Sequence, residues 1–431
     1  LRGIKGTEFI QKDRFNRDIG KYKDGALDIP SISGKDLTIT IDSKLQEYGE
    51  ILMKNKKGAI VAIEPNSGEI LSLVSSPSYN PNLLVGRERS KNYFELYKDS
   101  IYRPLIDKSL LSMFPPGSPF KILVGLTALQ EEIITEKSTI YCKGYYIYGK
   151  EKRKINCHCG GGYRNIYNAI SLSCNSYFAD IYRKTINSQN NTKENFDNWS
   201  NHIKSFGLGN YLNNDLPIGK KGVVPDSEYY DRWYPDFKWG ATTTISNSIG
   251  QGEILTTPIQ LANMTAAVAN EGYYYTPHII KKIDGDTIDV RFKIPIKTSI
   301  DSTHFKTINK ALYSVFKSGT GRLLNVPGIE ICGKSGTSEN FTKINGIKTQ
   351  LSDHSIFIAY APKENPTIAI SVLVENAGYG SVWAGRIASL MIEKYINDNI
   401  SLKRMEKIVL NKNLEKEYLK PYLSKAFNIN E

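Results

Sequence analysis

Strand-like runs lie near both ends of this chain of 431 residues, and helical patterns fill the sequence between them. The strand-like runs are residues 37–41, 59–63 and 70–74 toward one end, and 331–338, 355–360 and 367–374 toward the other. Apolar residues at helical spacing cover residues 43–53, 120–131, 167–183 and 257–270. Strands at both ends with helices between them predict an α/β domain of the α+β type. In such a domain, one sheet is closed by distant pieces of the chain.

The two ends of the chain differ in composition from this central region. Residues 1–35 are polar and rich in glycine, which predicts a linker at the end of an upstream unit. Residues 401–431 are charged and helical in pattern, so we expect a helical C-terminal appendage. No apolar run approaches the roughly 18 residues of a membrane-spanning helix. Because the chain begins with Leu1 and not Met, we expect any anchor to lie upstream of it.

The charge of the chain limits the choice of partners. Lys and Arg total 56 against 44 Asp and Glu, a formal net charge of +12. Such an excess suits nucleic acid, an anionic membrane surface or an anionic polymer. The basic residues form no concentrated stripe and are not interleaved with aromatic residues, and no nucleic-acid-binding motif is present. We therefore expect no nucleic-acid partner.

A serine and a lysine three residues apart form the first candidate motif. Pro116 and Gly117 break the chain, Ser118 suits the N-cap of a helix, and Pro119 suits its first turn. Residues at this spacing share a helix face, so the Ser118 hydroxyl and the Lys121 amine can meet. A serine becomes a nucleophile when a base takes its proton, and burial at a helix N-terminus would lower the pKa of Lys121 for that role. An ordinary capped helix with a surface lysine explains the same residues.

The second candidate motif is Ser173-Cys174-Asn175. Residues two apart do not share a helix face, so this segment is predicted to form a turn between two helices. From such a turn both polar side chains could project into a cleft. Ser173 would relay a proton, and Asn175 would hold a substrate amide. The alternative is a polar turn without chemistry.

The third candidate motif is Lys334-Ser335-Gly336-Thr337, inside a strand-like run. A glycine within a strand often marks the close approach of another backbone, and a substrate could add to this edge as a further strand. Lys334 would supply a positive charge for a carboxylate, and the hydroxyls of Ser335 and Thr337 would donate hydrogen bonds to it. The alternative is an edge strand weakened by glycine and protected by lysine.

In this order the three motifs resemble those of the serine acyltransferases that include penicillin-binding proteins and class A β-lactamases. Residues 58–71, 76–82 and 249–262 also look like parts of a penicillin-binding transpeptidase domain, and the resemblance covers about residues 30–400. It is closest to class B, in the branch that serves cell elongation. One departure is Ser335, where many relatives carry threonine; the hydroxyl is kept.

The resemblance implies a β-lactamase/transpeptidase-like fold, with an antiparallel sheet of about five strands flanked by helices. It also divides the chain into three parts. Residues 1–35 would be the remnant of an N-terminal pedestal domain and its linker, residues 36–400 the transpeptidase domain, and residues 401–431 the appendage.

The reaction implied by the resemblance is acyl transfer between peptidoglycan stem peptides. Lys121 would take the proton of Ser118, which attacks the carbonyl between two D-alanines, and Ser173 would pass a proton to the leaving D-alanine. The backbone N–H groups of Ser118 and Thr337 would form the oxyanion hole. The substrate-binding set would be Lys334, Ser335, Gly336 and Thr337, no catalytic cofactor would be needed, and β-lactams would inhibit covalently.

The resemblance also implies a place and a partner. We expect the periplasmic face of the inner membrane, an N-terminal anchor outside this fragment, and a membrane-embedded glycan polymerase as partner. The net positive charge fits an anionic cell wall and membrane surface. Two alternative functions are a β-lactamase or D,D-carboxypeptidase, which send the acyl group to water, and a non-enzymatic β-lactam sensor or scaffold.

Four of the five cysteines lie close together in the sequence, at Cys142, Cys157, Cys159 and Cys174. Four thiolates, or three with His158 as a substitute, would suit a structural tetrahedral zinc ion. Some members of the elongation branch carry a metal site between their first two motifs, which favours this interpretation. A disulfide such as Cys142–Cys157, or free buried thiols, are the alternatives.

Overall fold

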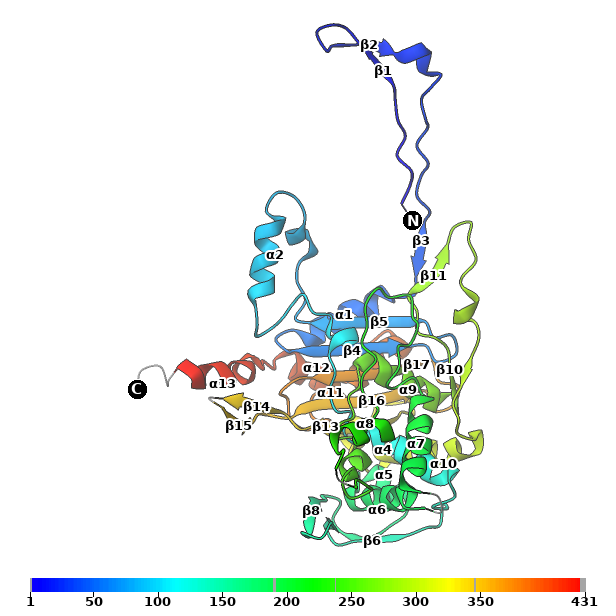
Figure 1. The fold of residues 1–431 in the computed structure, drawn as a ribbon, viewed down its shortest axis with the longest axis vertical. Helices are drawn as coiled ribbons and strands as arrows, with labels where there is room; N and C mark the ends of the chain where they lie inside the picture. The colour runs from blue at the N-terminus through cyan, green and yellow to red at the C-terminus, as the bar shows by residue number, and fades with distance from the viewer. Residues whose placement is uncertain (1, 189–190, 237, 345, 427–431) are drawn as a thin grey trace.

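The computed structural model describes residues 2–188, 191–236, 238–344 and 346–426. At its centre is a five-stranded antiparallel sheet in the order β13-β16-β17-β4-β5 (Figure 1). The strands are β4 (Gly58–Ile63), β5 (Ile70–Ser76), β13 (Cys332–Ser338), β16 (His354–Ala361) and β17 (Ile368–Val374). The pairing of β17 with β4 joins the two ends of the chain in one sheet. The predicted fold class is confirmed.

Helices cover both faces of this sheet. Helices α1 (Ser43–Met53) and α11 (Ala384–Asn397) pack together on one face, and α9 (Pro258–Ala269) packs on the other. Every residue of β4, β16 and β17 is buried, which explains why these strands read as continuous apolar runs.

A group of helices lies beside β13 (Figure 1). Its members are α4 (Lys121–Gln130), α5 (Ile166–Ser171), α6 (Asn175–Ile186), α7 (Thr192–Lys204), α8 (Ser227–Trp233) and α10 (Ser302–Lys317). The helical pattern of residues 167–183 is divided between α5 and α6. The chain turns at residues 172–174 because Ser173 takes a positive φ of 58°.

Several segments lie outside the sheet and its helices. Residues 2–35 form an extended arm in which β1 (Ile10–Lys12) pairs with β2 (Asp18–Lys21), and α2 (Arg89–Lys98) projects from the body on the same side (Figure 1). The C-terminal helices α12 (Lys403–Leu410) and α13 (Glu415–Ala426) follow α11. The remaining α-helix is α3 (Lys108–Leu111), and the remaining strands are β3 (Leu37–Ile39), β6 (Ile140–Cys142), β7 (Tyr145–Tyr148), β8 (Arg153–Asn156), β9 (Gly162–Arg164), β10 (Tyr273–Tyr274), β11 (Ile280–Ile283), β12 (Ile296–Lys297), β14 (Phe341–Ile344) and β15 (Ile347–Gln350).

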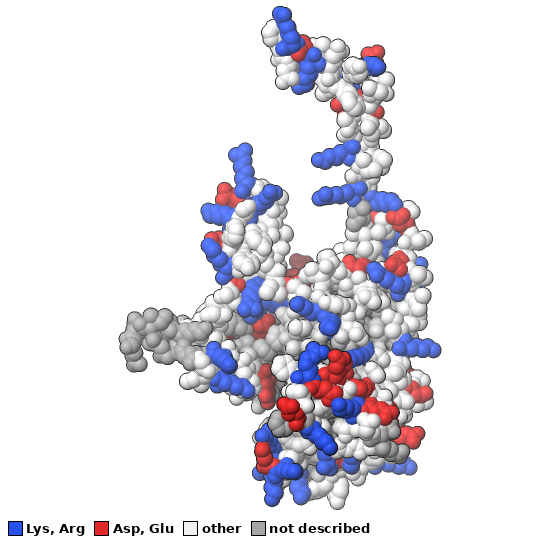
Figure 2. All heavy atoms as spheres, in the orientation of Figure 1, with Lys and Arg blue, Asp and Glu red and all other residues white. Residues whose placement is uncertain are grey.

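The sequence predicts that basic residues form no concentrated stripe and that no run is long and apolar enough to span a membrane. On the face drawn in Figure 2, Lys and Arg are spread over the arm, α2 and the body, and Asp and Glu lie among them. Within the described residues, none of the helices combines the length and apolar character needed to cross a membrane.

Candidate active site

Ser118 lies three residues before the helix α4, directly against the edge of the sheet. Its predicted role as the N-cap is wrong, because Phe120 precedes α4 and no side chain caps that helix. A short 3-10 turn, Ser118–Phe120, leads into α4, and Gly117 before it has a φ of 62°. A Cβ on Gly117 would lie 2.7 Å from the carbonyl oxygen of Thr337, so both the backbone conformation and the lack of space require glycine. The N–H of Gly117 donates to the carbonyl oxygen of Gly250 at 2.8 Å. The backbone of Ser118 is thereby held next to β13.

A chain of hydrogen bonds links the residues of the first two motifs. The Ser173 hydroxyl donates to Ser118 Oγ at 2.9 Å. Lys121 Nζ donates to Ser173 Oγ at 3.1 Å, to the Ser173 carbonyl oxygen at 2.9 Å and to Asn175 Oδ1 at 2.5 Å. The structure therefore brings the four candidate catalytic residues together, and the hydroxyl of Ser173 connects Ser118 with Lys121.

Lys121 has the properties that a general base needs. Its side chain is fully buried, and burial lowers its pKa from 10.5 to about 8. A lysine with this pKa is partly neutral near neutral pH and can accept a proton. The hydrogen bonds from Lys121 to Ser173 and from Ser173 to Ser118 thus join a hydroxyl to a buried amine of lowered pKa, the arrangement that a proton transfer between them needs.

The turn that carries Ser173 is held in an unfavourable backbone conformation. A residue other than glycine at a φ of 58° costs about 1–2 kcal/mol. The Ser173 and Cys174 N–H groups donate to carbonyl oxygens of α5, and Asn175 Nδ2 donates to the Asn156 carbonyl oxygen at 2.7 Å. These bonds keep the hydroxyl of Ser173 pointed at Ser118.

The third motif forms the edge strand β13 of the sheet, beside Ser118. Ser335 and Thr337 are partly exposed, and Gly336 lies between them. A Cβ on Gly336 would lie 2.5 Å from Pro119 Cδ, so the close approach expected at this glycine is made by the segment that carries Ser118. A ligand bound along β13 would therefore lie next to Ser118.

Lys334 is more deeply buried than its expected role suggests. Its side chain has no exposed surface, and Nζ donates to the Ser335 carbonyl oxygen at 3.1 Å. Burial, and secondarily the charge of Lys121, hold its pKa well below the usual value. A carboxylate bound beside it would favour the charged form.

Two polar residues that contact the third motif were not among the site residues predicted from the sequence. Thr320 Oγ1 lies 2.9 Å from Ser335 Oγ, and Gln251 Nε2 donates to the Thr337 carbonyl oxygen at 3.0 Å. Gly319 and Gly321 beside Thr320 signal a turn, but a turn signal carries no chemistry. Gln251 lies within residues 249–262, which resemble the family, and nothing else in the sequence pointed to Gln251 as a site residue.

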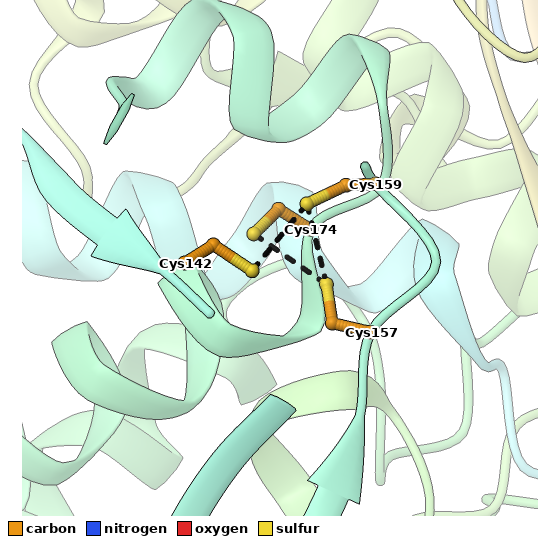
Figure 3. Close-up of side chains that lie close together, drawn as sticks. All are labelled: Cys142, Cys157, Cys159 and Cys174. Carbon is orange, nitrogen blue, oxygen red and sulfur yellow. Dashed lines mark hydrogen bonds between the residues drawn. The ribbon is translucent and has the colours of Figure 1, made fainter. Parts of the chain in front are cut away.

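The four clustered cysteines, which include Cys174 of the second motif, meet in space (Figure 3). All four are buried, and their Sγ atoms all lie within 4.8 Å of one another. The shortest separations are 3.4 Å for Cys157–Cys159 and 3.6 Å for both Cys157–Cys174 and Cys142–Cys159. His158 is exposed and is not a member of the cluster. All five cysteines are free, so the disulfide alternative is not formed in this structure.

The donor set of this cluster fits a zinc ion. A tetrahedral site with Zn–S bonds of about 2.3 Å separates neighbouring sulfurs by about 3.8 Å, close to the observed values. Backbone N–H groups of Gly144 and Asn175 donate to Cys142 Sγ at 3.3 Å and to Cys157 Sγ at 3.1 Å. Hydrogen bonds from Cys174 and the backbone lower the pKa of the Cys157 thiol. Cys157 thus favours the thiolate, the form that binds metal, whereas its hydrogen bond and burial raise the pKa of Cys174, and burial raises the pKa of Cys142.

Comparison with known proteins agrees with this geometry. The family model described as the penicillin-binding protein transpeptidase domain matches residues 58–393. The peptidoglycan D,D-transpeptidase MrdA of Acinetobacter baumannii is 33% identical over 88% of this chain and 56% of its own length. MrdA of Haemophilus influenzae is 31% identical over 93% of this chain and 61% of its own length. This chain thus spans less than two thirds of these relatives.

Solved structures give the same result. Penicillin-binding protein 2 (PBP2) of Pseudomonas aeruginosa in complex with WCK 5153 is 33% identical, with a TM-score of 0.74 over 85% of this chain and 77% of that one. PBP2 from Helicobacter pylori in its complex with MreC is 26% identical, with a TM-score of 0.73 over 91% of this chain and 69% of that one. The family model covers more than half of the sequence, and so the chain belongs to the family of penicillin-binding protein transpeptidase domains.

Proposed function

We propose that this chain is the catalytic part of a peptidoglycan D,D-transpeptidase that cross-links stem peptides during cell elongation. The observation that carries the proposal is the hydrogen-bonded chain from Ser118 through Ser173 to the buried amine of Lys121. The names of the curated relatives support the reaction, and two relatives of known structure are PBP2 proteins.

In the first half of the reaction, Ser118 becomes acylated. Neutral Lys121 accepts the Ser118 proton through the hydroxyl of Ser173, and Ser118 Oγ attacks the carbonyl carbon between the two D-alanines. The N–H groups of Ser118 and Thr337 stabilise the oxyanion, each by about 3–4 kcal/mol. The close packing of Gly117 on Thr337 supports this pair of donors. The C–N bond then breaks, and the proton returns through Ser173 to the nitrogen of the leaving D-alanine.

In the second half, an amine of a neighbouring stem peptide attacks the ester on Ser118. Lys121 accepts the proton of that amine, the new amide bond forms, and Ser118 Oγ leaves and regains a proton. The substrate carboxylate is held during acylation by the hydroxyls of Ser335 and Thr337 and by the charge of Lys334. A β-lactam would acylate Ser118 and remain bound, because its leaving group stays attached.

We expect intact mass spectrometry to detect one penicillin adduct per chain after exposure to benzylpenicillin, and peptide mapping to locate it on Ser118. An adduct on any other residue would overturn the proposal. The lifetime of the adduct separates the alternatives, because fast hydrolysis of the penicillin favours a β-lactamase. A long-lived adduct with no cross-linking of stem peptides by the full-length protein favours a sensor.

The rate of acylation should depend on pH through Lys121. Only the neutral amine accepts a proton, and the folded pKa is about 8. Below this value we expect the second-order rate of penicillin acylation to rise about tenfold per pH unit, and above it to level off. Stopped-flow measurements from pH 6 to 9 would check this, with circular dichroism at each pH as the control for unfolding. A flat profile would contradict a lysine base.

We further propose that Cys142, Cys157, Cys159 and Cys174 hold a structural zinc ion. Zinc would supply a cross-link between the end of β6, the segment after β8 and the start of α6. Because Cys174 lies between Ser173 and Asn175, the chain held by this cluster includes the second motif itself. The catalytic steps need no cofactor.

Other parts of the proposal concern the whole protein. We propose action at the periplasmic face of the inner membrane, where peptidoglycan is assembled, with stem peptides as substrates and β-lactams as inhibitors. We propose that residues 36–400 are the transpeptidase domain, that residues 1–35 are part of a pedestal, and that residues 401–431 are a C-terminal appendage. A membrane-embedded glycan polymerase is the proposed partner, and the PBP2–MreC complex of H. pylori supports a place in a multiprotein assembly.

A further inference from the structure

A turn after α10 connects the second and third motifs. The N–H of Thr320 donates to the carbonyl oxygen of Ser171 at 3.1 Å, and Ser171 ends α5 just before the turn that carries Ser173. A Cβ on Gly319 would lie 2.3 Å from the same carbonyl oxygen, so the contact requires glycine. The N–H of Gly321 donates to the Val315 carbonyl oxygen at 3.0 Å. The backbone of this turn is therefore fixed against α5 and α10.

From this fixed turn, the side chain of Thr320 reaches the third motif. Thr320 Oγ1 and Ser335 Oγ are 2.9 Å apart, and either hydroxyl can be the donor. Ser335 is partly exposed and Thr320 is exposed, so both lie at the open side of β13. Each hydroxyl carries a single proton. The direction of this one hydrogen bond consequently decides where the proton of Ser335 points.

A bound carboxylate would select one of the two directions. Ser335 can donate to a carboxylate only if its proton is not used on Thr320. The bond between the two hydroxyls then persists only with Thr320 as the donor. In that arrangement the Thr320 proton lies on Ser335 Oγ and the Ser335 proton points toward the ligand, and each bond polarises the next.

We propose that Thr320 is a positioning residue for carboxylate recognition, which donates to Ser335 Oγ and so directs the Ser335 proton to the terminal carboxylate of the ligand. The inference rests on the proposed function, since it assigns a further residue to the same substrate site. It also means that one turn, held by the end of α5, ties carboxylate recognition on β13 to the position of the second motif.

The proposal is tested by ligand binding in a Ser118→Ala background, where no acyl transfer can occur. The probes are N-acetyl-D-alanyl-D-alanine and its C-terminal amide, and NMR titration gives their affinities. Thr320→Val keeps the branched shape but lacks the hydroxyl, and we expect it to weaken binding of the carboxylate about threefold to tenfold. Binding of the neutral amide should change by less than about twofold, because hydrogen bonds to charged groups are the stronger ones. Thr320→Ser, which keeps the hydroxyl, should restore the preference for the carboxylate.

A double-mutant comparison separates positioning from direct contact. If Thr320 acts through Ser335, Thr320→Val should cause no further loss in a Ser335→Ala background. A loss of the same size in both backgrounds, or an equal loss for both probes, would overturn the proposal. Melting temperatures within about 2 °C of each other would exclude a general effect on folding.

Failure of the proposal for Thr320 can be distinguished from failure of the proposed reaction. If benzylpenicillin forms no adduct on Ser118 in the otherwise unchanged chain, the proposed reaction fails. NMR titration would still measure how much more tightly the protein binds the carboxylate probe than the amide probe, and whether this difference depends on Thr320. If the adduct forms and Thr320→Val leaves that preference unchanged, only the inference about Thr320 fails.

Discussion

Replacing Ser118 by alanine should abolish covalent labelling by a fluorescent penicillin. Ser118 is partly exposed next to β13, and its Oγ is linked through Ser173 to the buried amine of Lys121. Without this oxygen no ester can form, so the loss should be complete. The fold should remain, because the substitution removes one partly exposed hydrogen bond, worth about 1 kcal/mol. Gel fluorescence and intact mass spectrometry would both report the result.

Two further variants make this result specific. Ser112→Ala changes a partly buried serine of the same segment, outside the hydrogen-bonded chain, and should label at the original rate. Lys121→Met removes the base but leaves the nucleophile, so labelling should continue about 10²- to 10⁴-fold more slowly. Labelling of the Ser118→Ala protein at any other serine would contradict the assignment of the nucleophile.

The parts of the site that follow from local sequence were predictable. Pro119 predicts a helix start close by, and the spacing from Ser118 to Lys121 predicts that both side chains lie on one side of it. A glycine within the apolar strand predicts the close approach at Gly336. These inferences depend on neighbours in the sequence and on the known properties of each residue type.

The remaining features depend on contacts between distant parts of the chain. The hydroxyl of Ser173 lies between Ser118 and Lys121 because α5 and α6 meet at a turn with positive φ. A serine at this position does not predict a positive φ. Thr320 reaches Ser335 only because a turn after α10 packs on Ser171. Cysteine spacing predicted a cluster, but only the fold excludes His158 from it.

Loss of zinc should destabilise the domain and slow acylation together. We expect about one zinc per chain in protein purified without chelator, and Cys142→Ser should lose it. Removing a cross-link from a buried site should lower the free energy of unfolding by about 4–5 kcal/mol and the melting temperature by about 10 °C. Because Ser173 and Asn175 flank Cys174, their displacement should slow penicillin acylation about 100-fold. Metal analysis, calorimetry and labelling kinetics would measure the three effects.

The control variants test which side chains bind the metal. His158→Ala should keep both zinc and acylation, since His158 is exposed and lies outside the cluster. Cys332→Ser changes a buried cysteine that is not part of the cluster, and it should keep zinc whatever its effect on stability. Cys142 reaches α6 both through the cluster and through its own hydrogen bond to Ser176 Oγ at 3.3 Å, so a loss of acylation in Cys142→Ser supports the proposal only if zinc is lost with it. Protein that holds no zinc and has two fewer titratable thiols would contain a disulfide, and the zinc proposal would then be wrong.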